Sequence, residues 1–133
     1  MTQFRISEAA SLLGVSDDTV RRWIDAGALT ADTSASRTTI AGADLAAFAV
    51  ERARRPDDPD AGHSSARNRF VGLVTAITAD TVMAQVELQC GPFRVVSLMS
   101  SEAVRELGLE VGSRAAAVVK ATTVVVETTG GTR

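Results

Sequence analysis

The fold of much of this chain is decided by residues 70–98, which read FVGLVTAITADTVMAQVELQCGPFRVVSL. β-Branched and aromatic side chains are frequent here, and apolar and polar residues tend to alternate, which is typical of strands with one buried face. Turn-forming residues divide the stretch at Asp80 and at Gly91-Pro92. We therefore predict three strands, at 70–74, 82–88 and 93–98.

The same pattern continues toward the C-terminus. Two more β-rich runs, at 115–119 and 124–126, are separated by the polar pair Thr122-Thr123. One short helix is predicted at 101–107, with Gly108 as its stop. Five strands with a helix between the third and the fourth describe a small OB-like barrel, whose closed sheet hides its own edges.

Residues 4–53 have helical spacing instead. Ser7 is predicted to cap a first helix over 8–13, and Gly14 stands where a helix end needs a left-handed residue. Ser16 is predicted to cap a second helix, which ends at Gly27. Two short helices joined by a tight glycine-containing turn form the helix-turn-helix pattern.

The rest of this segment completes a small module. Trp23 shares a helix face with Val20 and Ile24, so we expect it in the core. Residues 29–40 are interpreted as a hairpin wing, and Asp44 is predicted to cap a third helix over 45–52.

A linker poor in apolar side chains follows, with two prolines, a glycine and the only histidine, His63, which we interpret as solvated. The predicted class is α+β, with a winged helix-turn-helix module and a five-stranded OB-like barrel. The predicted boundaries are 1–53 for the helix-turn-helix domain, 54–64 for the linker, 65–128 for the barrel and 129–133 for a tail.

Composition limits the functions that are open to the chain. An apolar fraction of 45% and a net charge of −2 suit a soluble globular protein. No apolar run is long enough to span a bilayer, and the N-terminus lacks a signal-peptide core, so we expect a cytoplasmic protein. Cys90 is the single cysteine, which fits a reducing compartment.

Residues 6–29 resemble the helix-turn-helix of MerR-like and phage-excisionase-like regulators. The resemblance implies that the second helix enters the major groove of DNA and that the wing touches the backbone. The residues that would lie at the DNA are Ser16, Asp18, Thr19, Arg21 and Arg22, with Arg37 in the wing.

Charge leaves another interpretation of this module open. Residues 1–66 carry seven arginines against ten aspartates and glutamates, a poor balance for binding phosphates. Arg21 and Arg22 could instead form i,i+4 ion pairs with Asp17 and Asp18 on a solvated face. A protein-docking or degenerate module therefore remains an alternative to a DNA-binding one.

Residues 65–127 contain three ordered motifs. They are Ser65-Ala66-Arg67-Asn68 followed by Gly72 and Val74, Ser100 before Val104-Arg105-Glu106-Leu107-Gly108-Leu109 and Gly112, and Lys120-Ala121-Thr122. Together they resemble the molbindin (Mop/TOBE) domain. The resemblance implies that the chain binds molybdate or tungstate in sites shared between subunits. The implied oxyanion-binding residues are Ser65, Ala66, Arg67, Asn68, Ser100, Lys120, Ala121 and Thr122.

The residue types suit this chemistry, because a dianion taken partly out of water needs hydroxyls, N–H groups and cations, and the three motifs lack carboxylates. Ser100 precedes a helix whose first N–H groups favour an anion, and Lys120 is the only lysine of the chain. Taken singly, Arg67 could pair with a surface carboxylate, Ser100 could be only a helix cap and Lys120 could be a solvated strand end. Two departures from the family are Ala103, where a hydroxyl is usual, and the short Gly91-Pro92 turn.

Two functions follow as hypotheses. The first is a molybdate-responsive DNA-binding transcriptional regulator; the alternative is a molybdate storage or buffer protein whose helix-turn-helix module does not bind DNA specifically. An enzyme is disfavoured, because the sequence has no phosphate-binding loop, no paired carboxylates in a motif and no nucleophile beside a base. No bare metal ion is expected. Shared sites imply a homo-oligomer, a dimer at least and up to a hexamer.

Overall fold

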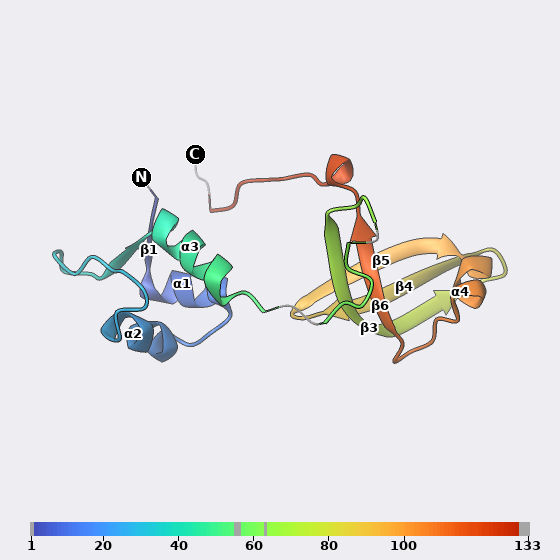
Figure 1. The fold of residues 1–133 in the computed structure, drawn as a ribbon, viewed down its shortest axis with the longest axis horizontal. Helices are drawn as coiled ribbons and strands as arrows, with labels where there is room; N and C mark the ends of the chain where they lie inside the picture. The colour runs from blue at the N-terminus through green and yellow to red at the C-terminus, as the bar shows by residue number, and fades with distance from the viewer. Residues whose placement is uncertain (1, 55–56, 63, 131–133) are drawn as a thin grey trace. The chain divides into compact units, whose positions relative to one another are not determined.

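The computed structural model describes residues 2–54, 57–62 and 64–130, and it divides into two compact units, Met1–Arg55 and Pro56–Arg133. Each unit has its own hydrophobic core. Figure 1 shows the order of the elements along the chain. The interpretation of His63 and the end of the predicted tail lie outside the described residues. No helix in the described ranges is long and apolar enough to cross a membrane.

The N-terminal unit consists of three helices and a two-stranded sheet. Its elements are β1 (Gln3–Arg5), α1 (Ile6–Leu13), α2 (Asp17–Asp25), β2 (Thr39–Ala41) and α3 (Gly42–Arg52). β1 and β2 are antiparallel, with Phe4 opposite Ile40. The two predicted helices of the helix-turn-helix and the third helix are thus present.

The turn between α1 and α2 follows the sequence prediction. Gly14 adopts a left-handed conformation with φ of 70°, which ends α1. Ser16 caps α2, because its Oγ accepts a hydrogen bond from the Thr19 N–H at 3.1 Å. Two other capping predictions are wrong. α1 already begins at Ile6, with Glu8 accepting from the Arg5 N–H, and α3 begins at Gly42, before Asp44.

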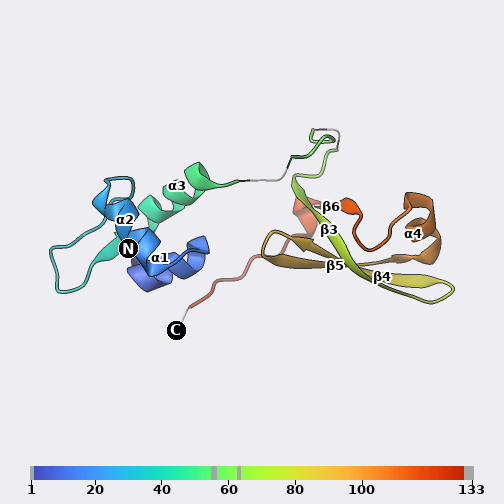
Figure 2. The ribbon, with the colours of Figure 1, turned by 90° about the horizontal axis from the view of Figure 1, so that it is seen from below.

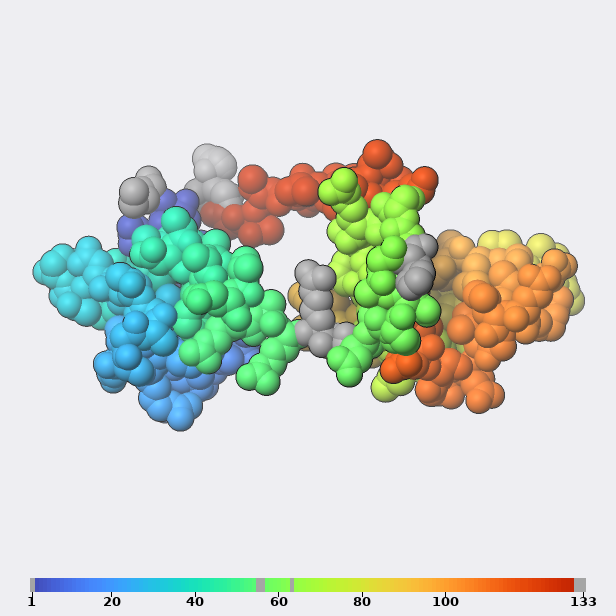
Figure 3. Space-filling model, in the orientation of Figure 1, coloured from blue at the N-terminus to red at the C-terminus, as the bar shows by residue number. Residues whose placement is uncertain are grey.

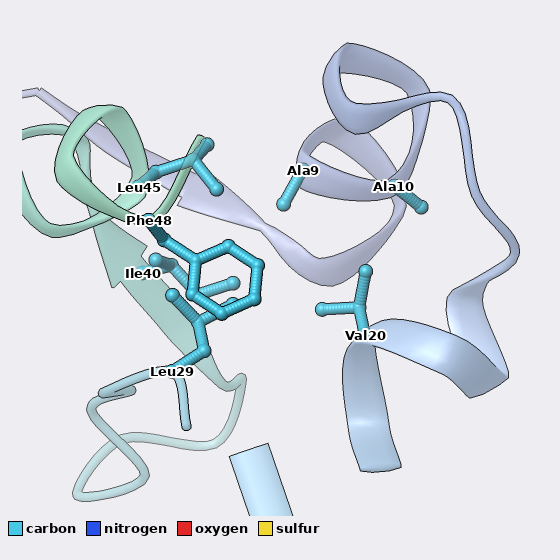
Figure 4. Close-up of a cluster of buried hydrophobic side chains, with 7 residues drawn as sticks. All are labelled: Ala9, Ala10, Val20, Leu29, Ile40, Leu45 and Phe48. Atoms are coloured by element: carbon cyan, nitrogen blue, oxygen red, sulfur yellow. The ribbon is translucent and has the colours of Figure 1, made fainter. Parts of the chain in front are cut away.

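The core of this unit lies among the three helices and the small sheet. Its buried residues, drawn in Figure 4, are Ala9, Ala10, Val20, Leu29, Ile40, Leu45 and Phe48. Trp23 packs against this core, with its ring 4.9 Å from that of Phe48, and the Arg52 guanidinium lies 5.2 Å from the Trp23 ring. Trp23 is therefore a packing residue, as its spacing predicts.

The segment between α2 and β2 is mainly a loop. Its one bridge joins Asp32 to Thr39, and Asp32 also accepts hydrogen bonds from the N–H and hydroxyl of Ser34. β2 pairs with β1 rather than with a strand inside residues 29–40. The expected two-stranded wing is reduced to this single bridge because the chain before Asp32 forms no strand.

The C-terminal unit is built on one antiparallel sheet with strand order β5-β4-β3-β6. Its elements are β3 (Asn68–Ala79), β4 (Met83–Cys90), β5 (Phe93–Ser100), α4 (Ser101–Leu107), β6 (Arg114–Val119) and the 3₁₀ turn η1 (Ala121–Thr123). β3 pairs with β6 through its first half and with β4 through its second half, with a bulge between Val74 and Ala76. Figure 2 shows the long, curved course of β3.

The prediction of a fifth strand in a closed barrel is wrong for this chain by itself. Val124, Val125 and Val126 form no strand, and their exposures are 47%, 83% and 86%. β5 and β6 lie at the two edges of the sheet and do not pair with each other. The valines have strand propensity, but a strand also needs a partner, and this chain places none beside them.

Gly72 permits the close crossing at the centre of the sheet. A Cβ atom added there would collide with the Gln89 carbonyl oxygen and would lie 2.8 Å from Cys90 Sγ. Cys90 is buried, its thiol lies 3.4 Å from the Phe70 carbonyl, and burial raises its pKa. The only cysteine thus serves as a packing residue.

Candidate functional site

Two of the three predicted oxyanion motifs meet at one end of the sheet. Asn68, the last residue of the first motif, begins β3 and lies opposite Val119, the last residue of β6. Arg67 comes directly before this pair and Lys120 directly after it. The antiparallel register therefore places the two cationic residues at the same end of the paired strands β3 and β6, although they are far apart in the sequence. This end of the two strands is called the Arg67–Lys120 edge below.

Local hydrogen bonds fix both chain segments at this edge. The Asn68 side-chain amide donates to the Val119 carbonyl at 3.1 Å, and the Thr123 hydroxyl donates to the Lys120 carbonyl at 2.8 Å. The Ala66 N–H donates to Ser64 Oγ. Lys120 precedes the turn η1, and a 3₁₀ turn leaves its first N–H groups, here those of Ala121 and Thr122, without partners in the turn.

The polar groups at this edge face solvent. Ser65, Arg67, Lys120, Ala121 and Thr122 are exposed, while Ala66 and Asn68 are half-buried. Among the described residues, no carboxylate oxygen lies within 4.0 Å of the Arg67 or Lys120 nitrogens. Arg67 therefore does not pair with a surface carboxylate among the described residues, as the alternative would require.

Ser100 lies elsewhere. It ends β5 opposite Met83, beside the end of β3, where Ala79 pairs with Ala84. The first motif is at the start of β3, a strand of 12 residues, which is about 35 Å from end to end when extended. Figure 1 shows α4, which follows Ser100, and the red turn after β6 at different ends of the unit. One chain therefore does not bring Ser100 to Arg67 and Lys120.

At its own end, Ser100 caps α4. Its Oγ accepts a hydrogen bond from the Ala103 N–H at 3.0 Å, while its hydroxyl hydrogen remains available to a ligand. The neighbouring Ser101 is buried, and its hydroxyl donates to the Asp80 carbonyl at 2.7 Å. The sequence analysis did not identify Ser101 as a residue that stabilises this end of the sheet. Its position directly after the capping residue is the one sequence feature that could have indicated it.

The second helix of the N-terminal unit carries the predicted DNA-binding residues. Asp18, Arg21 and Arg22 are exposed, Thr19 is half-buried, and Arg37 is exposed in the loop before β2. Arg21 donates to Asp18 at 3.3 Å and Arg22 donates to Thr19 Oγ1 at 3.1 Å. These contacts have i,i+3 spacing, and the i,i+4 ion pairs of the alternative interpretation are not formed. Such exposed pairs are weak and can be exchanged for phosphates.

An apolar groove of about 800 Å³ lies on another part of the N-terminal unit. Its lining comes from the chain start, α1 and the β2–α3 region, and includes Phe4, Leu12, Leu13, Ala46 and Ala49. None of the predicted DNA-binding residues lines it. In the described ranges, no group of three His, Cys, Asp or Glu side chains could hold a metal ion.

Comparison with known proteins places both units. The TOBE domain profile matches residues 64–126, and a helix-turn-helix domain profile matches residues 4–53. The "Probable molybdenum-pterin-binding protein" of Haemophilus influenzae is 46% identical over 63 residues, which are 47% of this chain and 91% of that protein. The chain belongs to the TOBE-domain family. The resemblance drawn from the sequence motifs is thereby confirmed.

Other relatives of this TOBE-domain protein differ in length. "Molybdenum-pterin-binding protein 2" of Clostridium pasteurianum is 38% identical over 47% of this chain and 93% of its own length. "Molybdenum transport protein ModE" of Herbaspirillum seropedicae is 38% identical over 49% of this chain, but only 24% of its own length. The solved structure of MopII from Clostridium pasteurianum is 36% identical, with a TM-score of 0.47, over 49% of this chain and 98% of the other.

The TOBE match spans every predicted oxyanion-binding residue, and the helix-turn-helix match spans every predicted DNA-binding residue. The relatives are named for binding or transport of molybdenum and not as enzymes, and the expectation that this chain is not an enzyme is confirmed.

Proposed function

We propose that this TOBE-domain protein binds molybdate or tungstate and acts as a molybdate-responsive, DNA-binding transcriptional regulator in the cytoplasm. The observation that carries the proposal is the pairing of Asn68 with Val119, which brings Arg67 and Lys120 to one exposed edge. The relatives named for molybdenum support the choice of oxyanion.

The chemistry of this edge fits a tetrahedral dianion. Arg67 and Lys120 supply positive charge, the Ser65 hydroxyl supplies a donor, and Ala121 and Thr122 supply backbone N–H groups. Neither cation has a carboxylate partner in the part of the chain that the structure describes. An arriving oxyanion would therefore not have to displace an internal anion from them.

The complete site requires a second copy of the chain. Because Ser100 lies at the other end of the sheet, we propose that a neighbouring subunit provides it to the Arg67–Lys120 edge. The exposed Val124, Val125 and Val126 support association, since a run of apolar side chains in solvent is a feature of subunit interfaces. The assembly is a dimer at least and up to a hexamer.

In the regulator, oxyanion binding between subunits changes how strongly the helix-turn-helix units bind DNA. Ser16, Asp18, Thr19, Arg21 and Arg22 would contact the major groove, and Arg37 the backbone. If both ligands act on the same conformational equilibrium, molybdate and DNA must change each other's affinity by the same factor.

The alternative is a molybdate store whose helix-turn-helix unit does not bind DNA specifically. Two observations favour it: residues 1–66 have more acidic than basic side chains, and Arg21 and Arg22 already have partners within α2. Fluorescence polarisation with DNA from upstream of the gene, with and without molybdate, separates the two functions. Specific binding that changes with molybdate supports the regulator, and its absence in both conditions leaves the store.

Calorimetric titration with molybdate tests the oxyanion site itself. Arg67→Ala and Lys120→Ala should each weaken binding by about 1 kcal/mol or more, the scale of a charge-assisted hydrogen bond, which is roughly a fivefold change in Kd. Arg54→Ala is the control, because it removes an exposed arginine outside the matched TOBE residues. Unchanged affinity in both site variants would refute the assignment.

A further inference from the structure

An ion pair joins the segment in front of the first oxyanion motif to the strand β3. Asp58 Oδ2 lies 2.7 Å from Arg69 Nε, and Asp58 Oδ1 lies 3.1 Å from an Arg69 terminal nitrogen. The two side chains are only 16% and 20% exposed. A bidentate, largely covered pair has a fixed geometry, unlike the exposed pairs elsewhere in the chain.

The chain around Asp58 is folded to hold its carboxylate in place. Asp58 accepts a hydrogen bond from the Asp60 N–H at 3.1 Å, and its carbonyl accepts one from the Ala61 N–H at 3.2 Å. The hydrogen bond from Arg69 is the main reason that the pKa of Asp58 is below its usual value, and the charge of Arg114 acts in the same direction. Asp58 is thus ionised whenever the protein is near neutral pH.

The pair closes a loop that contains the first oxyanion motif. Ser65, Ala66 and Arg67 lie between Asp58 and Arg69 in the sequence, and Arg69 follows Asn68 in β3, opposite Val118. The C-terminal end of the loop is therefore held in the sheet at Arg69, and its N-terminal end is held by the bond from Asp58 to Arg69. Figure 3 shows the C-terminal unit, in green to orange, as a space-filling surface.

We propose that Asp58 is a positioning residue for the oxyanion site, which it orders through Arg69 without touching the ligand. This inference rests on the proposed function. Holding both ends of the loop reduces the conformational freedom that Ser65 and Arg67 must lose when they bind an anion. The same contact occupies the Arg69 guanidinium and leaves Arg67 and Lys120 as the cations of the site.

The sign of a charge-removing substitution distinguishes this role from simple electrostatics. Removing a carboxylate near an anion site should strengthen binding if only Coulomb forces count. Positioning predicts the opposite result. Asp58→Asn should weaken molybdate binding by about tenfold, because ordering one or two side chains costs about that much affinity. Asp60→Asn is the matched control, since it removes a charge from the same turn without breaking the Arg69 pair.

The experiment is calorimetric titration of the full-length chain with sodium molybdate at neutral pH, for the wild type, Asp58→Asn, Asp60→Asn and the exchange variant Asp58→Arg with Arg69→Asp. We expect Asp60→Asn to bind as well as the wild type or better, Asp58→Asn to bind more weakly, and the exchange variant to recover part of the loss. Thermal unfolding confirms that each variant is folded.

The outcomes separate the two proposals. A wild type that does not bind molybdate overturns the proposed function and this inference with it. A wild type that binds molybdate, together with an Asp58→Asn variant that binds equally or more tightly, overturns the positioning role alone. Equal weakening in Asp58→Asn and Asp60→Asn also overturns it, because the effect would then not depend on the ion pair.

Discussion

The side chain of Asn68 donates a hydrogen bond to the main-chain carbonyl of Val119 at 3.1 Å, across the register pair that these two residues form in the sheet. This bond joins the first and third oxyanion motifs, since Arg67 precedes one partner and Lys120 follows the other. Asn68 therefore has a structural function in the proposed site, whether or not it also contacts the ligand.

Replacing Asn68 by alanine should lower both stability and molybdate affinity. The loss of one part-buried hydrogen bond costs about 1 kcal/mol, and the freed ends of β3 and β6 should let Arg67 and Lys120 separate. Urea denaturation measures the stability and calorimetry the affinity. If stability falls while affinity is unchanged, Asn68 fastens the strands without shaping the site.

Ser100 offers a test in which capping and ligand binding are separated. Ser100→Ala removes the hydroxyl that accepts from the Ala103 N–H and should cost about 1 kcal/mol of stability, besides weakening molybdate binding. Ser100→Asp keeps a capping oxygen but adds a negative charge, so it should preserve stability and abolish binding. Full molybdate binding by the aspartate variant would contradict a role for Ser100 in the site.

The valine run after η1 should be needed for assembly. Val125→Asp places a charge in a segment where Val125 is 83% exposed in the single chain, and we expect it to shift the oligomer toward monomer. Val50→Asp is a matched control, because Val50 is 78% exposed on the N-terminal unit. Sedimentation velocity measures the oligomeric state of both variants. A wild type that is monomeric at micromolar concentration, yet binds molybdate fully, would contradict the shared site.

Acid should destabilise the C-terminal unit in part through Asp58. Its pairing with Arg69 lowers its pKa in the folded state, so its contribution is present above the pKa of the unfolded chain and is lost as pH falls through the folded value. Below about pH 4, wild-type stability should therefore fall more steeply than that of Asp58→Asn. Urea denaturation followed by circular dichroism between pH 7 and pH 3 measures the stability of both proteins. The same dependence of the urea midpoint on pH in the wild type and in Asp58→Asn would contradict the prediction.

Local signals in the sequence predicted the features that depend on neighbouring residues. Gly14 and Ser16 specify the helix-turn-helix turn through backbone conformation and capping, and the structure has both as expected. The helix after Ser100 and its end at Gly108 were predicted for the same reason. The N-caps of α1 and α3 were misplaced, because α1 begins at Ile6, before Ser7, and α3 begins at Gly42, before Asp44, and neither true N-cap has a capping side chain that the sequence could reveal.

Features that depend on distant partners could not be predicted in this way. Residues 124–126 have the composition of a strand, but strand formation depends on an available edge and not on propensity alone. The bond between Asp58 and Arg69 crosses from the predicted linker to a strand, and an aspartate among prolines carries no local sign of such a partner. For the site, the motifs indicated which residues to consider, and only the register showed that Arg67 and Lys120 share an edge that Ser100 does not reach.

The packing of Trp23 against Phe48 and Arg52 has a practical consequence. It is the only tryptophan of the chain, there is no tyrosine, and its ring lies 4.9 Å from that of Phe48 inside the N-terminal unit. Intrinsic fluorescence excited at long ultraviolet wavelength therefore comes from one unit alone. The protein therefore contains an intrinsic fluorescent probe of its helix-turn-helix unit that does not report on the sheet, so melting of the N-terminal unit alone can be followed without attaching a dye.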